Sequence, residues 1–182
     1  VVYLETRPQD GRGRGEVSVR DLLRAVLRLR PDRIIVGEIR GGEAMELVQA
    51  LSTGHGGSMT TLHANYAIDA MHRLETMCMM SDINLPVGPL RAQIISAIDV
   101  VVQQNRLRDG SRRVVGVFEA EGLGSHGEYV MRPLFEFKQT GEERGTGRIL
   151  GSLVPTGKAP TFLEDLIVRG VKVPSVMTAK QS

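Results

Sequence analysis

The chain has 182 residues, an apolar fraction of 41% and a formal net charge of only +2. This length corresponds to one domain of usual size, and the composition excludes a disordered tail, a collagen-like fibre and a coiled coil. So small a net charge does not indicate a protein that coats nucleic acid. The single cysteine, Cys78, excludes a disulfide framework and a zinc site of several cysteines, and it favours a reducing compartment.

Nothing in the sequence indicates a membrane span, because no run approaches the roughly 18 apolar residues that one requires. The chain begins at Val1 with no initiator methionine, and its first residues already have the apolar pattern of a strand. We therefore expect a fragment of a longer protein, with further sequence upstream.

The first half of the sequence alternates between strand and helix patterns. Predicted in chain order are a strand at residues 1–6, a glycine-rich loop at 9–15, a helix from about 19 to 29, a strand at 33–37, a helix at 43–52, a strand at 58–62, and helices at 65–80 and 86–97. Ser18 and Asp21 have the spacing of a capping box at the start of the first helix. Strands that alternate with helices through short connections predict a parallel sheet with crossover helices.

The second half of the sequence changes to an antiparallel pattern. Strand-like residues at 98–107 and 113–120 flank Asp109-Gly110, a pair typical of a β-hairpin turn. Later in the chain we predict, in order, a third strand at 129–138, a mobile glycine-rich loop at 139–151, and a short helix at 162–169 capped by Thr161 and ended by Gly170.

The stretch Arg33–Arg40 is the most informative part of the sequence. Its apolar residues predict a strand of the type that is buried on both faces, and this strand ends in the carboxylate of Glu38. At the C-terminal edge of a parallel strand, such an acid lies in the crevice where open α/β sheets bind ligands. In folds that hydrolyse phosphates it holds Mg²⁺ through water or polarises the attacking water. The alternative, a surface glutamate paired with Arg40, stays open.

A second candidate stretch runs from Thr53 to Asn65. His55 precedes its predicted strand and His63 ends it. An imidazole at the end of a strand can sense a γ-phosphate when a carboxylate ends the neighbouring strand, because both point into the same crevice. The alternative is one capping histidine and one core histidine, and no third ligand lies nearby to complete a zinc site.

These two stretches resemble conserved boxes of the secretion ATPase superfamily of type II and type IV secretion. Arg28–Gly41 resembles its Walker B segment, and Thr53–Asn65 resembles its His box. Within the superfamily, Leu4–Pro8 and Arg106–Arg113 look most like the tight-adherence (Tad/Flp) pilus branch, the CpaF-like group. The resemblance runs from about residue 1 to 137, and weakly to residue 170.

The resemblance implies an α/β fold: a truncated RecA-like P-loop ATPase core, with a parallel sheet and flanking helices, followed by an antiparallel β hairpin and a C-terminal tail. Residues 1–138 would be the C-terminal part of the RecA-like ATPase domain, and residues 139–182 a glycine-rich loop and helical tail. The sequence departs from the family pattern, because no Gly-x-x-x-x-Gly-Lys-Ser/Thr P-loop occurs in it and the acidic box before Walker B is absent. We therefore expect the chain alone not to hydrolyse ATP, and a P-loop about 30–50 residues before Val1.

The resemblance also implies roles for single residues. Glu38 matches the Walker B acid, assigned to Mg²⁺, through water, and to the attacking water. His63 matches the second histidine of the His box, a relay of the nucleotide state or a subunit contact, and His55 matches the first, with the same role. Arg7 and Arg40 are candidate charge partners for phosphate, in cis or across a subunit boundary. Gly37 and Thr61 are candidate nucleotide-binding positions.

The implied activity is ATP hydrolysis, with ATP and Mg²⁺ as cofactors, in a homo-hexameric ring that drives pilus assembly or protein secretion. The implied partners are pilus or secretion platform proteins of the inner membrane, with no specific nucleic acid, and the implied location is cytoplasmic and peripheral to that membrane. Three alternatives stay open: a conjugation or type IV secretion motor, a RecA-type nucleic-acid motor, and a non-catalytic assembly module. The alternation of arginine with acidic residues speaks against the nucleic-acid motor, which would have a basic stripe.

Overall fold

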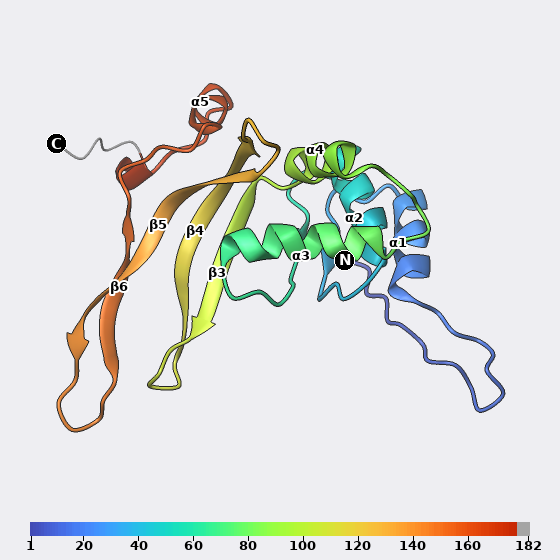
Figure 1. The fold of residues 1–182 in the computed structure, drawn as a ribbon, viewed down its shortest axis with the longest axis horizontal. Coiled ribbons are helices and arrows are strands. Elements are labelled where there is room, and N and C mark those ends of the chain that lie inside the picture. Colours follow the sequence, from blue (N-terminus) through green and yellow to red (C-terminus); the bar gives the residue numbers. More distant parts are fainter. Residues whose placement is uncertain (178–182) are drawn as a thin grey trace. The chain divides into compact units, whose positions relative to one another are not determined.

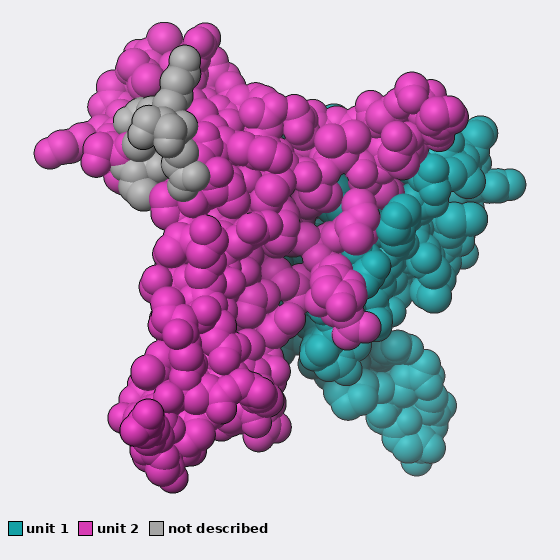
Figure 2. Space-filling model, turned by 60° about the vertical axis from the view of Figure 1, so that its left-hand side comes forward, with its two compact units in different colours: residues 1–64, 69–97 teal, residues 65–68, 98–182 magenta. Residues whose placement is uncertain are grey.

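The computed structural model describes residues 1–177, which form two compact units (Figures 1 and 2). Unit 1 contains residues 1–64 and 69–97, and unit 2 contains residues 65–68 and those from 98 onward. No helix of the described residues has the length and apolar character needed to cross a membrane.

Unit 1 consists of helices and a two-stranded parallel sheet (Figure 1). Its elements are α1 (Val19–Arg28), β1 (Ile35–Val36), α2 (Glu43–Ser52), β2 (Met59–Thr60), α3 (Ala67–Met79, of which the first two residues belong to unit 2) and α4 (Val87–Ala97). The capping box at α1 is confirmed, because the Ser18 hydroxyl accepts from the Asp21 N–H and the Asp21 carboxylate accepts from the Ser18 N–H. The largest fully buried side chains come mainly from α2, α3 and α4: Ile39, Met45, Leu47, Val48, Met71, Cys78 and Ile94.

The strand predictions for unit 1 are partly confirmed. β1 and β2 pair in parallel, with Ile35 opposite Met59, as the alternation of strand and helix predicts. The strand predicted at residues 33–37 is not buried on both faces, because Ile34 is 5% exposed and Ile35 is 71% exposed. On the neighbouring strand β2, Met59 is 60% exposed. The predicted strand at residues 1–6 is also wrong: these residues are exposed and form no ladder, since a strand requires a hydrogen-bonded neighbour. Only a single bridge, Arg7 to Val17, forms near this segment.

Unit 2 is built on a four-stranded antiparallel sheet in the order β3-β4-β5-β6 (Figure 1). Its elements are β3 (Val100–Arg106), β4 (Arg112–Leu123), β5 (Tyr129–Glu142), β6 (Ile149–Pro155), α5 (Leu163–Val168) and a 3₁₀ turn (Ser175–Met177). The hairpin at Asp109-Gly110 is confirmed, with Gly110 at a φ of 82° that favours glycine. Consecutive hairpins therefore build the whole sheet.

The prediction of a mobile glycine-rich loop at residues 139–151 is wrong. β5 continues to Glu142, across the boundary expected at residue 138, and β6 begins at Ile149 and pairs with it. Glycines at 141 and 151 lie inside these strands, and a bulge on β5 lies between Gln139 and Gly141. The predicted single hairpin is thus part of a larger sheet.

The last helix forms as predicted, but its predicted cap does not. Gly170 follows α5 with a left-handed φ of 73°. The Thr161 side chain donates instead to the buried carboxylate of Glu119 on β4, and the Thr161 N–H donates to the same carboxylate at 2.9 Å. A sequence pattern for a helix cap does not distinguish these two uses of a threonine, since both satisfy the hydroxyl.

Candidate functional site

The candidate site lies where the chain leaves β1 and β2 in unit 1. Because the two strands run in parallel, their C-terminal ends meet at one edge. Pairing continues beyond the strands, since the Ile39 N–H donates to the Thr61 carbonyl at 3.1 Å. This bond holds the two segments that follow the strands side by side, and it brings Glu38 next to His63.

Glu38 is the centre of a three-residue cluster. Its Oε1 lies 2.7 Å from Nδ1 of His63, and its Oε2 accepts from a guanidinium nitrogen of Arg40 at 2.5 Å. The Glu38 side chain is 24% exposed, whereas those of His63 and Arg40 are about four-fifths exposed, at 80% and 78%. The carboxylate is therefore held at the base of the cluster, and the side chains of Arg40 and His63 extend from it towards solvent.

The pKa of Glu38 lies below its usual range. The main cause is the hydrogen bond from Arg40, and the hydrogen bond with His63 acts in the same direction, while burial opposes both. The same pair raises the pKa of Arg40. Glu38 is consequently a carboxylate at neutral pH, the protonation state that is needed to bind a cation or to accept a hydrogen bond from water.

Two further predicted positions lie beside this cluster. The Thr61 hydroxyl donates to the Gly37 carbonyl at 2.5 Å, which ties the end of β2 to the residue before Glu38. Both residues are exposed. In this structure the threonine hydroxyl thus positions the backbone that carries the acid.

The structure does not bring His55 and Arg7 to the site. His55 precedes β2, and its Nδ1 lies 3.0 Å from the Ala50 carbonyl near the end of α2. It therefore occupies the opposite end of the strand from His63 and satisfies a helix C-terminus. The Arg7 guanidinium donates to the Gly15 carbonyl at 2.6 Å, which closes its own exposed loop.

The sequence analysis missed Glu43, the first residue of α2. Its Oε1 accepts from the backbone N–H groups of Arg40 and Gly41, at 2.8 and 3.1 Å. This carboxylate fixes the turn that follows β1, and it thereby directs Arg40 back towards Glu38. The available signal was a glutamate in the first turn of a predicted helix, a position that favours negative charge.

Gly42 in the same turn is required by close packing. A Cβ at this position would lie 2.9 Å from the Arg20 guanidinium and 3.0 Å from the Met80 carbonyl oxygen. The turn between β1 and α2 is therefore tightly confined.

The side chains of the described residues do not form a metal site by themselves. No group of three or more His, Cys, Asp and Glu side chains with a suitable arrangement is present among residues 1–177. A single carboxylate is nevertheless compatible with Mg²⁺, because this ion keeps several waters and takes further oxygens from substrate phosphates. Cys78 offers no chemistry, since burial raises the pKa of its thiol to about 12.

Glu38 and His63 follow the C-terminal ends of two parallel strands, which is where open α/β sheets bind ligands. Residues 5–131 match the family described as type II/IV secretion system protein, and the chain belongs to this family. The family assignment confirms the resemblance at superfamily level.

Individual relatives and a solved structure agree with the family. The type IV secretion system protein PtlH of Bordetella pertussis is 45% identical over 120 residues, which are 64% of this chain and 35% of that protein. The conjugal transfer protein TrbB of Rhizobium radiobacter is 42% identical over 106 residues, 58% of this chain and 31% of that protein. The crystal structure of the VirB11 ATPase from the Brucella suis type IV secretion system, in complex with sulphate, superposes with a TM-score of 0.54 and 34% identity, and covers 57% of this chain and 32% of that one.

The chain spans about a third of the length of these relatives. The chain thus has a mixed α/β fold and is a member of the type II/IV secretion family.

Proposed function

We propose that this chain is the C-terminal part of an ATPase motor of type II/IV secretion, and that Glu38, His63 and Arg40 belong to its nucleotide site. The observation that supports this proposal is the ionised Glu38, which is held between a histidine and an arginine at the C-terminal edge of two parallel strands. The superposition on a solved VirB11 ATPase supports it further.

The residues present fit Mg-ATP at this edge. Glu38 would hold Mg²⁺ through water, Arg40 and His63 would face the phosphates, and Gly37 and Thr61 would shape the backbone beneath them. Bound Mg²⁺ would supply charge neutralisation of the transferred phosphate. In the chain itself, Arg40 and His63 are already oriented by Glu38 and Glu43, so that few groups must reorient when an anion arrives.

The phosphate cradle would come from outside this chain. The sequence contains no P-loop motif, and this motif supplies the backbone N–H groups and the lysine that bind phosphates. In the proposed motor the P-loop lies upstream in a longer protein. His55 and Arg7 would act through a neighbouring subunit of a hexameric ring, since neither lies beside Glu38.

Two kinds of machine within the family are candidates for the complete motor. The resemblance of Leu4–Pro8 and Arg106–Arg113 to the tight-adherence pilus branch favours pilus assembly at the inner membrane, with platform proteins of that membrane as partners. The similarity to PtlH and TrbB favours the second candidate, a type IV secretion or conjugation motor. Both machines use the same site.

The experiment that tests the proposal is Glu38→Gln in the longer protein that carries this chain. We expect ATP turnover to fall roughly 100-fold or more, about 3 kcal/mol in barrier height, because the neutral amide cannot stabilise Mg²⁺ and the attacking water. Nucleotide binding, measured with a fluorescent ATP analogue, should persist. Glu16→Gln, which changes an exposed acid in the loop before α1, is the matched control. Turnover within a few-fold of wild type would remove Glu38 from the site.

A second substitution tests the partner of Glu38. His63→Ala should leave the melting temperature within a few degrees of wild type, since this side chain is 80% exposed and buries little apolar area. Turnover should fall by about tenfold or more, as expected when a hydrogen bond to a charged group is lost. A variant that unfolds, or that turns over ATP like wild type, would assign a structural or incidental role to His63.

A further inference from the structure

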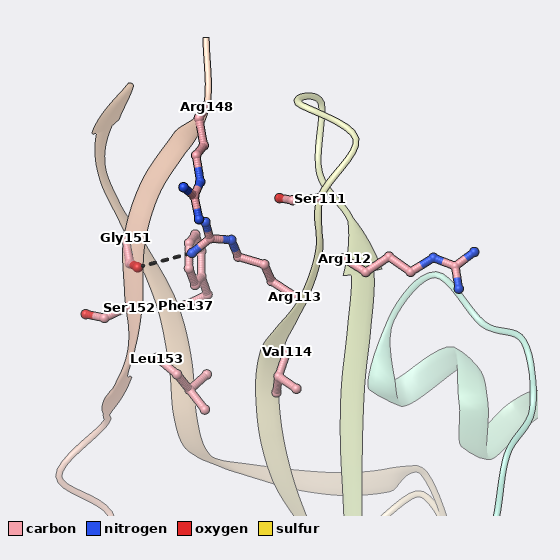
Figure 3. A pocket seen from close by; sticks show the side chains of 9 residues that line it. All are labelled: Ser111, Arg112, Arg113, Val114, Phe137, Arg148, Gly151, Ser152 and Leu153. Atoms are coloured by element: carbon pink, nitrogen blue, oxygen red, sulfur yellow. Dashed lines mark hydrogen bonds between the residues drawn. The ribbon is translucent and has the colours of Figure 1, made fainter. Parts of the chain in front are cut away.

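Unit 2 carries a hollow of about 540 Å³ that the nucleotide-site proposal does not use (Figure 3). β4, β5 and β6 line it, with Phe137 on its floor and Gly151 and Leu153 along one side. Figure 3 shows the side chains of Arg113 and Arg148 pointing towards one another in this space, and Arg112 directed away from it.

One edge of β6 is paired with β5, and its even-numbered residues make this pairing. Just before β6, the Arg148 carbonyl accepts from the Glu143 N–H at 2.9 Å, and just after β6, the Thr156 N–H donates to the Leu134 carbonyl at 2.9 Å. In an antiparallel pair, each residue directs both its N–H and its C=O either to the partner strand or away from it, in alternation. The odd-numbered residues of β6 therefore direct their backbone groups to the free edge.

The first part of this free edge is already covered by the β3–β4 hairpin. The Ile149 N–H donates to the Asp109 carboxylate at 2.7 Å, and the Ile149 carbonyl accepts from Arg113 at 3.0 Å. The Gly151 carbonyl accepts from the same guanidinium at 3.5 Å. These bonds confirm the direction of the odd-numbered groups, and they show that two side chains take the place of a neighbouring strand.

The next part of the edge is open. By the same alternation, the N–H of Gly151 and both backbone groups of Leu153 point to the free edge, and no loop or turn of the described residues provides a hydrogen bond to them. Exposed edges are usually protected by charged side chains. β6 has none between Ile149 and Pro155, and Leu153 is 38% exposed.

The open edge lies beside an excess of positive charge. Arg148 is exposed and makes no ion pair with any carboxylate of the described residues. Arg113 lies 5.7 Å from the Phe137 ring centre and donates to carbonyls rather than to a carboxylate. Asp109, whose charge interacts with that of Arg113, already accepts from Ile149 and Ser111. An incoming carboxylate would find two guanidinium groups, of which that of Arg113 is held by its bonds to Ile149 and Gly151.

We propose that this hollow binds an extended segment of a partner protein, which adds to β6 as a fifth strand and places an acidic side chain against Arg148 and Arg113. Backbone pairing at Gly151 and Leu153 supplies affinity, and the arginines select the side chain. The charge alone would also suit a lipid headgroup or a nucleic-acid phosphate. Neither of these, however, uses a row of unpaired N–H and C=O groups, whereas a peptide backbone matches it.

The test is a random peptide library, displayed on phage and selected against the full chain of residues 1–182. Enriched sequences should combine β-branched residues with an acidic residue at a fixed place. A synthetic peptide of the most enriched sequence, labelled with fluorescein, should bind at least about tenfold more weakly to Arg148→Glu, because a charge-assisted hydrogen bond is replaced by repulsion. Arg144→Glu is the matched control, since Arg144 is exposed in the same hairpin but does not line the hollow.

Leu153→Pro tests backbone pairing at the free edge of β6 separately from the charge of the two arginines. Proline removes an N–H that points to the free edge, so that pairing with β5 and the melting temperature should stay intact while peptide binding is lost. No enrichment, or enriched peptides that bind all variants equally, would overturn the proposal. Vesicles with anionic lipid, or single-stranded DNA, are measured in parallel. The vesicles or the DNA could bind wild type and Leu153→Pro equally and lose binding only to Arg148→Glu. In that case the hollow is a polyanion site and the peptide proposal is wrong.

Discussion

The two units hold their strands together in different ways. In unit 1, β1 and β2 contribute only two residues each, and the helix α2 and its connections separate them in the chain. In unit 2, strands of seven to fourteen residues follow one another through hairpins. The residues of the candidate site thus follow the strands of the smaller sheet. Their geometry depends on helix packing and on the turn at Gly42 and Glu43 rather than on an extended ladder.

Each unit also buries a carboxylate that joins segments distant in sequence. Glu46 on α2 accepts from Arg20 and Arg24 of α1, at 3.0 and 2.9 Å. Glu119 on β4 accepts from Thr161 and lies 3.7 Å from Arg132. Glu46 is 6% exposed and Glu119 is 3% exposed. Unit 1 has a second contact of this kind, between Glu75 on α3 and Arg91 on α4. The comparison predicts that the helices of unit 1 rely on such contacts, whereas unit 2 adds its contact to a sheet that is already paired.

The largest expected effect tests this difference directly. Glu46→Ala should reduce the free energy of unfolding by roughly 3 kcal/mol, because it leaves Arg20 without its buried partner and opens a cavity beneath α1. Hydrogen exchange should accelerate in α1 and α2 and change little in β3–β6. The matched variant, Glu119→Ala, should instead accelerate exchange at the segment around Thr161. Equal acceleration in both units for either variant would contradict the idea that each carboxylate stabilises its own unit.

The site in unit 1 was predictable because the decisive information is local. An apolar strand that ends in Glu38, and a second strand that ends in His63, place two side chains at one edge if the strands are parallel neighbours, and the structure confirms this pairing. His55 lies in an equally suggestive pattern, but it precedes its strand. The end of the strand at which a histidine lies therefore decides whether it can meet the acid.

The extent of the sheet in unit 2 was not predictable from glycine content. Gly141 and Gly151 indicated a loop, yet both lie in strands. At Gly151 a Cβ would lie 2.6 Å from the Phe137 ring and 2.5 Å from the Lys138 carbonyl oxygen, so this glycine is needed for packing. Such a role depends on which side chain crosses the strand, and that is set by pairing between distant residues.

A smaller effect is expected from a glycine inside the sheet of unit 2. A Cβ at Gly116 on β4 would lie 2.4 Å from the Phe118 ring. Gly116→Ala should therefore destabilise the chain by about 1–3 kcal/mol, because the buried strand must shift or the ring must leave its position. Gly122→Ala on the same strand, where no atom lies within 4 Å, is the control and should have little effect on urea unfolding. Similar losses for both variants would mean that backbone freedom, and not the ring, limits the strand.

The smallest expected effect is a pH dependence at the contact of the β3–β4 hairpin with β6 in unit 2. Hydrogen bonds from Ser111 and from the Ile149 N–H lower the pKa of Asp109 to about 2, from an ordinary 3.8. Because the folded-state pKa is the lower one, the stabilisation is complete above the unfolded value and is lost as the pH falls through the folded value. Wild type should therefore be more stable than Asp109→Asn by a constant amount above about pH 5, and the difference should shrink between about pH 4 and pH 2. The measurement is urea unfolding of both proteins across this range, with exchange of the Ile149 amide as a local probe. A difference that does not change with pH would show that the shape of the Asp109 side chain, and not its charge, joins the β3–β4 hairpin to β6.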